Sequence, residues 1–120
     1  MEYRLERDDR GPLCFNGEQI SYVSTQTRTK ERWTELGVYR IDSDESPARW
    51  VVEAIGRSTV EGERDYHTVT MCSTPEDVAA ALSKRGRLSG PGLDAIEYAA
   101  DKDDELDVYL ERIFEDEVIS

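Results

Sequence analysis

Carboxylates recur at helical spacing near the C-terminal end of the sequence. Four of them are separated by three, four and four residues: Asp104, Asp107, Glu111 and Glu115. This spacing places them on one side of a helix, where neighbouring like charges repel one another. Such a row can bind a basic groove, including a groove built to hold nucleic acid. Together with the adjacent Asp116, these residues are predicted to contact a partner.

The acids of this helix fall into two groups, one near its start and one near its end. Asp103, Asp104 and Glu105 lie near its start, where negative charge complements the positive end of the helix dipole. Glu115 and Asp116 lie near its end, where the dipole favours cations. Helix stability therefore does not explain the later acids. Two explanations stay open for them: a basic partner, or a solvated face that aids solubility.

A second acidic stretch resembles a calcium loop only in part. Asp42, Asp44, Ser46 and Glu53 occupy positions 1, 3, 5 and 12 of the calcium-loop pattern. Pro47 stands at position 6, where that pattern needs glycine, and the flanking residues predict strands rather than helices. We interpret the stretch as a turn between strands and predict neither a metal site nor a cofactor.

The residues suited to nucleophilic or acid–base chemistry are few. His67 is the only histidine, and on a strand it shares a face with Val69 and Met71 while Cys72 points to the other face. Cys14 is distant in sequence, so its position relative to His67 stays undetermined. No GxSxG, HExxH or P-loop pattern is present. We predict no catalytic residue; the alternative is a small enzyme that uses Cys14 or His67 with a carboxylate.

The length and the net charge of the chain limit the classes of function that we expect for it. The 120 residues suit one domain, and 38% hydrophobic residues supply a small core. The net charge is −12, and the last twenty residues hold nine acids and two bases. This charge disfavours direct binding to nucleic acid or to an anionic membrane. The start of the chain has no signal-peptide pattern, and the two cysteines fit reduced thiols, so a cytoplasmic location is expected.

The first part of the chain has the patterns of β-strands. Four segments rich in β-branched and aromatic residues are predicted to be strands: 18–24, 33–41, 50–55 and 66–72. Short polar connections between them favour antiparallel neighbours. Residues 11–17 add a short edge strand or a bend, since Pro12 suits a sheet edge.

The later part has the patterns of helices. Thr74 is a predicted N-cap, with Pro75 in the first turn and Asp77 completing a capping box, and Gly86 is the predicted C′ residue just past the end of this helix. A second helix is predicted over about residues 93–100. The last helix has a regular apolar stripe: Leu106, Tyr109, Leu110, Ile113 and Phe114. A disordered tail would not have this stripe.

These elements predict an α+β fold. A four- to five-stranded antiparallel β-meander is followed by two or three C-terminal helices packed on one face. Residues 1–120 are expected to form a single domain, mainly β over 1–72 and mainly α over 74–117.

Three segments together resemble a known type of protein. RGPLCFNG, RWTELGVYR and WVVEAIGRS are similar to segments of a small, uncharacterised bacterial or mobile-element family, over about residues 3–65. The resemblance implies no activity, cofactor or site, and no residue role follows from it.

The leading hypothesis is a non-enzymatic acidic module that binds a protein with a basic surface. In its sharpest form it inhibits a nucleic-acid-binding protein by occupying that surface, as small acidic anti-defence proteins of phages and mobile elements do. The small enzyme described above is one alternative. A structural or regulatory subunit that acts through self-association is another, and both a monomer and a homodimer stay open.

Overall fold

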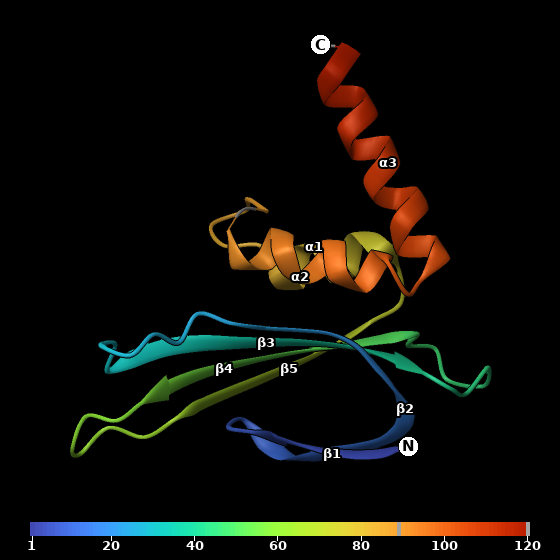
Figure 1. Ribbon diagram of the computed structural model, residues 1–120. Coiled ribbons are helices and arrows are strands. Elements are labelled where there is room, and N and C mark those ends of the chain that lie inside the picture. Colours follow the sequence, from blue (N-terminus) through green and yellow to red (C-terminus); the bar gives the residue numbers. More distant parts are fainter. Residues whose placement is uncertain (89, 120) are drawn as a thin grey trace.

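A five-stranded antiparallel sheet is followed by three helices in the computed structural model, which describes residues 1–88 and 90–119 (Figure 1). Side chains are described as far as residue 113. The strands are β1 (Glu2–Arg7), β2 (Arg10–Ser24), β3 (Arg32–Ile41), β4 (Trp50–Ser58) and β5 (Tyr66–Cys72). The helices are α1 (Pro75–Leu82), α2 (Pro91–Ala100) and α3 (Asp104–Ile119). The strands are ordered β1-β2-β3-β4-β5, which confirms the predicted meander and fold class.

β1 is the part of the sheet that the sequence pattern did not predict, and residues 11–17, predicted as a short edge strand or a bend, belong to the first half of β2. β2 is 15 residues long; its first half pairs with β1, and its second half pairs with β3. In β1 the apolar side chains of Tyr3 and Leu5 alternate with charged ones, which is too short a signal to define a strand. The sheet curls into a half-barrel, because the backbone of His67 on β5 bonds both the amide (3.1 Å) and the side chain (3.0 Å) of Asp8.

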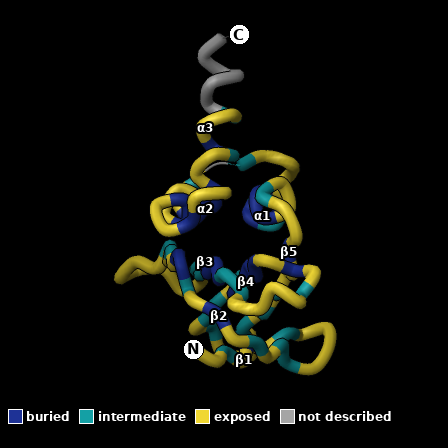
Figure 2. The backbone as a smooth tube through the Cα atoms, turned by 90° about the vertical axis from the view of Figure 1, so that its right-hand side faces the viewer, coloured by how far each residue is buried: buried dark blue, intermediate teal, exposed yellow. Residues whose placement is uncertain are grey.

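The two faces of the sheet hold different cores. Val38, Trp50 and Val52 pack against α1, α2 and the start of α3, and the buried residues concentrate between the sheet and these helices (Figure 2). On the other face, Tyr39 and Val51 pack with the N-terminal hairpin. Side chains alternate between the faces along each strand, so adjacent residues of β4 serve separate cores.

Helix α1 begins as predicted and ends earlier. Thr74 and Asp77 form the predicted capping box. The helix stops at Leu82, so the prediction that it continues until just before Gly86 is wrong. The hydroxyl of Ser83 donates to a carbonyl of the last turn, and residues 84–87 form a tight turn in which Arg85 and Gly86 have φ values of 56° and 74°. Two successive residues with positive φ cannot continue a right-handed helix.

Helix α2 is held close to its neighbours on two sides. A Cβ at Gly92 would collide with the carbonyl oxygen of Leu82, so glycine permits the close approach of α1 and α2. The Ser21 hydroxyl donates to the Ala95 carbonyl at 2.7 Å and fixes α2 on β2. The helix begins at Pro91, two residues before the predicted start, as expected for proline in a first turn.

Helix α3 packs through its first turns. Leu106 and Leu110 of the predicted stripe are buried in the helix-side core, and Tyr109 and Ile113 are partly buried. Phe114, the last member of the stripe, has a side chain outside the described residues. The helix rises steeply away from the layer formed by α1 and α2 (Figure 1).

Candidate functional site

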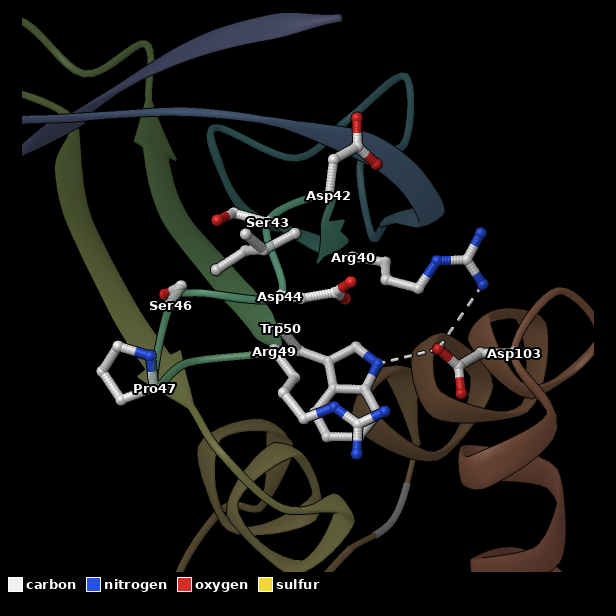
Figure 3. Close-up of a pocket in the computed structure, with 10 residues that line it drawn as sticks. Arg40, Asp42, Ser43, Asp44, Ser46, Pro47, Arg49, Trp50 and Asp103 are labelled. Atoms are coloured by element: carbon white, nitrogen blue, oxygen red, sulfur yellow. Dashed lines mark hydrogen bonds and ion pairs between the residues drawn. The ribbon is translucent and has the colours of Figure 1, made fainter.

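The base of α3 is attached to the sheet through one buried carboxylate. The side chain of Asp103 is 5% exposed. Its Oδ1 accepts the backbone N–H groups of Glu105 (3.0 Å) and Leu106 (3.1 Å), so it caps the helix N-terminus. Its Oδ2 accepts the indole N–H of Trp50 at 2.9 Å (Figure 3). One aspartate therefore joins the start of α3 to the start of β4.

Two arginines surround this contact. The guanidinium of Arg40 lies 3.8 Å from Asp103, and it also bonds Glu18 at 3.0 Å. Arg49 pairs with Glu105 through both of its terminal nitrogens, and its guanidinium lies 5.1 Å from the centroid of the Trp50 ring. We call Trp50, Asp103, Arg40, Arg49 and Glu105 the joint. Its acids and bases satisfy one another, which is the arrangement that makes buried charge tolerable.

A pocket of about 480 Å³ lies between the joint and the turn that connects β3 to β4 (Figure 3). The turn contributes Asp42, Asp44 and Ser46, the first three residues of the partial calcium pattern. Glu53, its fourth residue, lies on β4 and accepts a hydrogen bond from Tyr39 on the opposite face of the sheet. The structure therefore does not bring the four together. Arg40 and Arg49 line this pocket, and both pair with carboxylates. We therefore interpret the pocket as a polar part of the joint.

The predicted partner-binding acids lie beyond the joint. Asp104, Asp107 and Glu111 are exposed, and we call them the exposed row. None of the three belongs to an ion pair within the described part of the chain. Glu115 and Asp116, the other two predicted contacts, have side chains outside the described residues.

A shallow groove of about 360 Å³ runs beside the row, between α3 and the start of α1. Its apolar part is formed by Pro75, Tyr109 and Val108, and Val108 is 45% exposed. Glu76 and Arg112 stand at its polar rim. Burial raises the pKa of Tyr109 above its ordinary value, and the charge of Glu76 raises it further.

The candidate nucleophiles lie apart from this surface. Cys14 is exposed on β2, whereas Cys72 is buried against the helices. Burial, with a smaller contribution from the charge of Asp77, raises the pKa of Cys72 to about 11, so its thiol stays protonated at neutral pH. His67 has a buried Nδ1 that makes no hydrogen bond to the described residues. It therefore makes no contact with Cys14 of the kind that nucleophilic catalysis requires.

The residues that the structure describes contain neither a metal-binding cluster nor a membrane-spanning helix. Among them, no three histidine, cysteine, aspartate or glutamate side chains gather where they could hold a metal ion. Within the same residues, every helix is too short or too polar to cross a bilayer.

The joint is the feature that sequence reasoning missed. An aspartate directly before an apolar helical stripe is a recognised N-cap signal, so the capping role of Asp103 was open to prediction. Its bond to Trp50 was not, because the two residues are 53 positions apart and no local pattern links them.

Comparison of the chain with protein-family models, curated proteins and solved structures finds no match. What the chain does is therefore argued from its own surfaces.

Proposed function

We propose that this protein is a non-enzymatic binding module that places the exposed row of α3 against a basic surface of another protein. One observation carries the proposal. Asp103 and Glu105 are engaged inside the joint, whereas Asp104, Asp107 and Glu111 of the same stretch stay exposed and outside every ion pair of the described residues. Contacts inside the fold therefore explain Asp103 and Glu105 but not the three exposed acids.

Helix energetics support a role outside the fold for this row. Asp107 and Glu111 are four residues apart, so their carboxylates repel each other and destabilise α3 by about 0.2–0.5 kcal/mol. Lysine or arginine side chains of a partner would remove this repulsion. The row is thus better matched to a bound cationic surface than to the isolated helix.

The groove beside the row supplies a second kind of contact. Protein interfaces combine an apolar centre that excludes water with a polar rim. Val108 and Tyr109 offer apolar surface in the groove, and Asp104 and Glu76 lie at its edge. A partner with an apolar side chain inside a basic patch fits this arrangement.

The net charge supports the sharper form of the proposal, in which the partner surface normally binds nucleic acid. Sites that bind nucleic acid are rich in lysine and arginine and lose affinity steeply with salt. A chain with a net charge of −12 that concentrates acids on one helix would be attracted to such a site. The module would then act as an inhibitor by competing with nucleic acid.

The test compares two variants that lose the same charge. Asp107→Asn with Glu111→Gln neutralises part of the exposed row. Asp9→Asn with Glu61→Gln neutralises one aspartate and one glutamate at exposed positions in turns of the sheet. Each protein is immobilised and used to capture basic proteins from a cell lysate at low and high salt.

We expect a partner that the wild type and the turn variant retain at low salt and that the α3 variant loses. High salt should release it, and a duplex oligonucleotide should displace it if the sharper form holds. Equal capture by both variants would contradict the proposed role of the row. Retention in the presence of excess duplex would reject the inhibitor form alone.

A further inference from the structure

The edge of the sheet formed by β5 is open to an additional strand. Within the described residues β5 pairs with β4 alone, so its other side has no neighbour in the ladder. The backbone N–H and C=O groups on that side of an edge strand can pair with another extended segment. In Figure 1 the chain leaves this edge at the end of β5 and continues into α1.

The bonds to Asp8 show which residues of β5 direct their backbone groups to the open side. Asp8 bonds both the N–H and the C=O of His67 from the side opposite β4. Backbone direction alternates along a strand, so Val69 and Met71 present their N–H and C=O groups to the same side. Met71 is 54% exposed. Asp8 therefore occupies one end of this edge, and the backbone of residues 69–71 is available at the other.

The two edges of the sheet differ in charge. The other edge strand, β1, has four charged residues among its six: Glu2, Arg4, Glu6 and Arg7. The sequence of β5, YHTVTMC, contains no lysine, arginine, aspartate or glutamate. Charged side chains on an edge strand are one means by which proteins prevent pairing with other chains. The edge suited to pairing is therefore β5.

The side chains around the available backbone define the kind of segment that fits. Val69 packs against the hairpin-side core that contains Tyr39, and the exposed Met71 follows it on the same face. Thr68 and Thr70 are exposed on the opposite face. Cross-strand neighbours on one face contact each other, so apolar residues suit the first face and threonine-like residues suit the second. A segment that alternates valine-like and threonine-like residues matches both faces.

Charge distinguishes the two ends of β5. In the turn before it, residues 59–65, three acids are offset by Arg64 of the turn and by Arg32 and Arg57, which pair with two of them. Beyond its last residue, the exposed Glu76 belongs to no ion pair of the described residues and lies at the rim of the groove beside the exposed row. Lysine or arginine residues of a bound segment would therefore be attracted to the end of β5 that leads to α1.

We propose that an extended segment of the basic partner adds to β5 as a further antiparallel strand, with alternating β-branched residues beside 69–71 and lysine or arginine residues before them. Antiparallel addition continues the pattern of the sheet and places the N-terminal side of the segment at the end of β5 nearest α1. This pairing rests on the proposed function, since the segment belongs to the same partner. A second copy of the chain suits the edge less well, because two molecules with a net charge of −12 repel each other.

The test titrates a synthetic peptide, three lysines followed by five alternating valine and threonine residues, into the full chain and follows backbone amides by NMR. We expect saturable binding in which the amide protons of Val69 and Met71 shift and exchange more slowly with solvent. A peptide with its lysines after the strand residues should bind about tenfold more weakly. Binding without protection of these two amides would overturn the strand pairing, and equal binding of the two peptides would overturn the placement of the basic residues.

Two N-methylated forms of the first peptide are matched controls that leave the protein unchanged. Methyl groups on alternate amides block the hydrogen bonds on one side of an extended segment and leave those on the other side intact. One form should lose binding by at least about tenfold, and the form methylated on the other side should retain it. Equal binding of the two forms would overturn the proposal, because pairing through the backbone is what distinguishes them.

Protein variants separate the pairing from the proposed role of the exposed row. Met71→Pro removes an N–H that the β4 ladder does not use, whereas Met71→Ala keeps this N–H and shortens the side chain. Met71→Pro and the α3 variant, Asp107→Asn with Glu111→Gln, should both weaken peptide binding, and Met71→Ala should largely retain it.

The pattern of losses assigns any failure to one of the two proposals. A loss in the α3 variant with none in Met71→Pro would overturn the strand pairing and leave the role of the row intact. A loss in Met71→Pro with none in the α3 variant would support the pairing and contradict the role of the row. A dimer in light scattering that Met71→Pro converts to a monomer would assign this edge to a second copy and overturn the proposed partner segment.

Discussion

The base of α3 and its exposed row contain the same residue types in different surroundings. At the base, Asp103 is buried, caps the helix and accepts the Trp50 indole N–H, and Glu105 pairs with Arg49. In the row, Asp107 and Glu111 are exposed and belong to no ion pair of the described residues. The difference shows that the acids of one stretch do not share one role. Each carboxylate has to be interpreted from the residues of the sheet that contact it.

The largest expected effect comes from removing the carboxylate of the joint. Asp103→Ala takes away a helix cap and leaves the buried Trp50 N–H without an acceptor, which should lower the free energy of unfolding by about 2–4 kcal/mol. Urea denaturation followed by circular dichroism measures it. Asp101→Ala, two residues earlier and exposed, is the control. Similar losses in both variants would mean that Asp103 is not a structural anchor.

The Trp50 side of the same bond should give the next largest effect. Trp50→Phe keeps an aromatic ring but removes the N–H donor and some packing, so we expect a loss of about 2 kcal/mol in the free energy of unfolding. A double-mutant cycle with Asp103→Ala isolates the hydrogen bond. Strictly additive losses would show that the two residues do not interact in solution.

A smaller effect is expected for the outer ion pair of the joint. Arg49 and Glu105 are half-exposed, and pairs of this kind contribute less than about 1 kcal/mol. A cycle of Arg49→Gln and Glu105→Gln should therefore show a weak coupling that decreases further at high salt. A coupling above 2 kcal/mol would place this pair with Asp103 as a principal anchor of α3.

The smallest effect should have the opposite sign. Asp107→Asn with Glu111→Gln removes a repulsion between neighbours on α3, so the free energy of unfolding should stay constant or rise by about 0.2–0.5 kcal/mol. The same substitutions are expected to weaken partner binding. A clear loss of stability would contradict the comparison, because it would show that the row also supports the fold.

Local sequence patterns accounted for much of the fold. The capping box at Thr74 and Asp77 was predicted and found, because all its contacts lie within four residues. The segments of β3, β4 and β5 were recognised because β-branched and aromatic residues are frequent in them. The N-terminal strand was missed because it has only two apolar residues among charged ones, and its pairing with β2 and its packing on Tyr39 and Val51 are long-range contacts.

The candidate surfaces could be predicted less well. The exposure of Asp104, Asp107 and Glu111 followed from helical spacing alone. The joint did not follow from the sequence, because Trp50 and Asp103 are 53 positions apart and meet only in the folded structure.

The sequence by itself determined the succession of strands and helices from β2 onward, the start of α1 and the amphipathic character of α3, because these depend on contacts between near neighbours in the chain. Only the tertiary structure decided which acids are used internally. Asp103 became an anchor because the half-barrel brings Trp50 and Arg40 to the start of α3. Charge pairing depends on distance in space, which no spacing along the chain encodes.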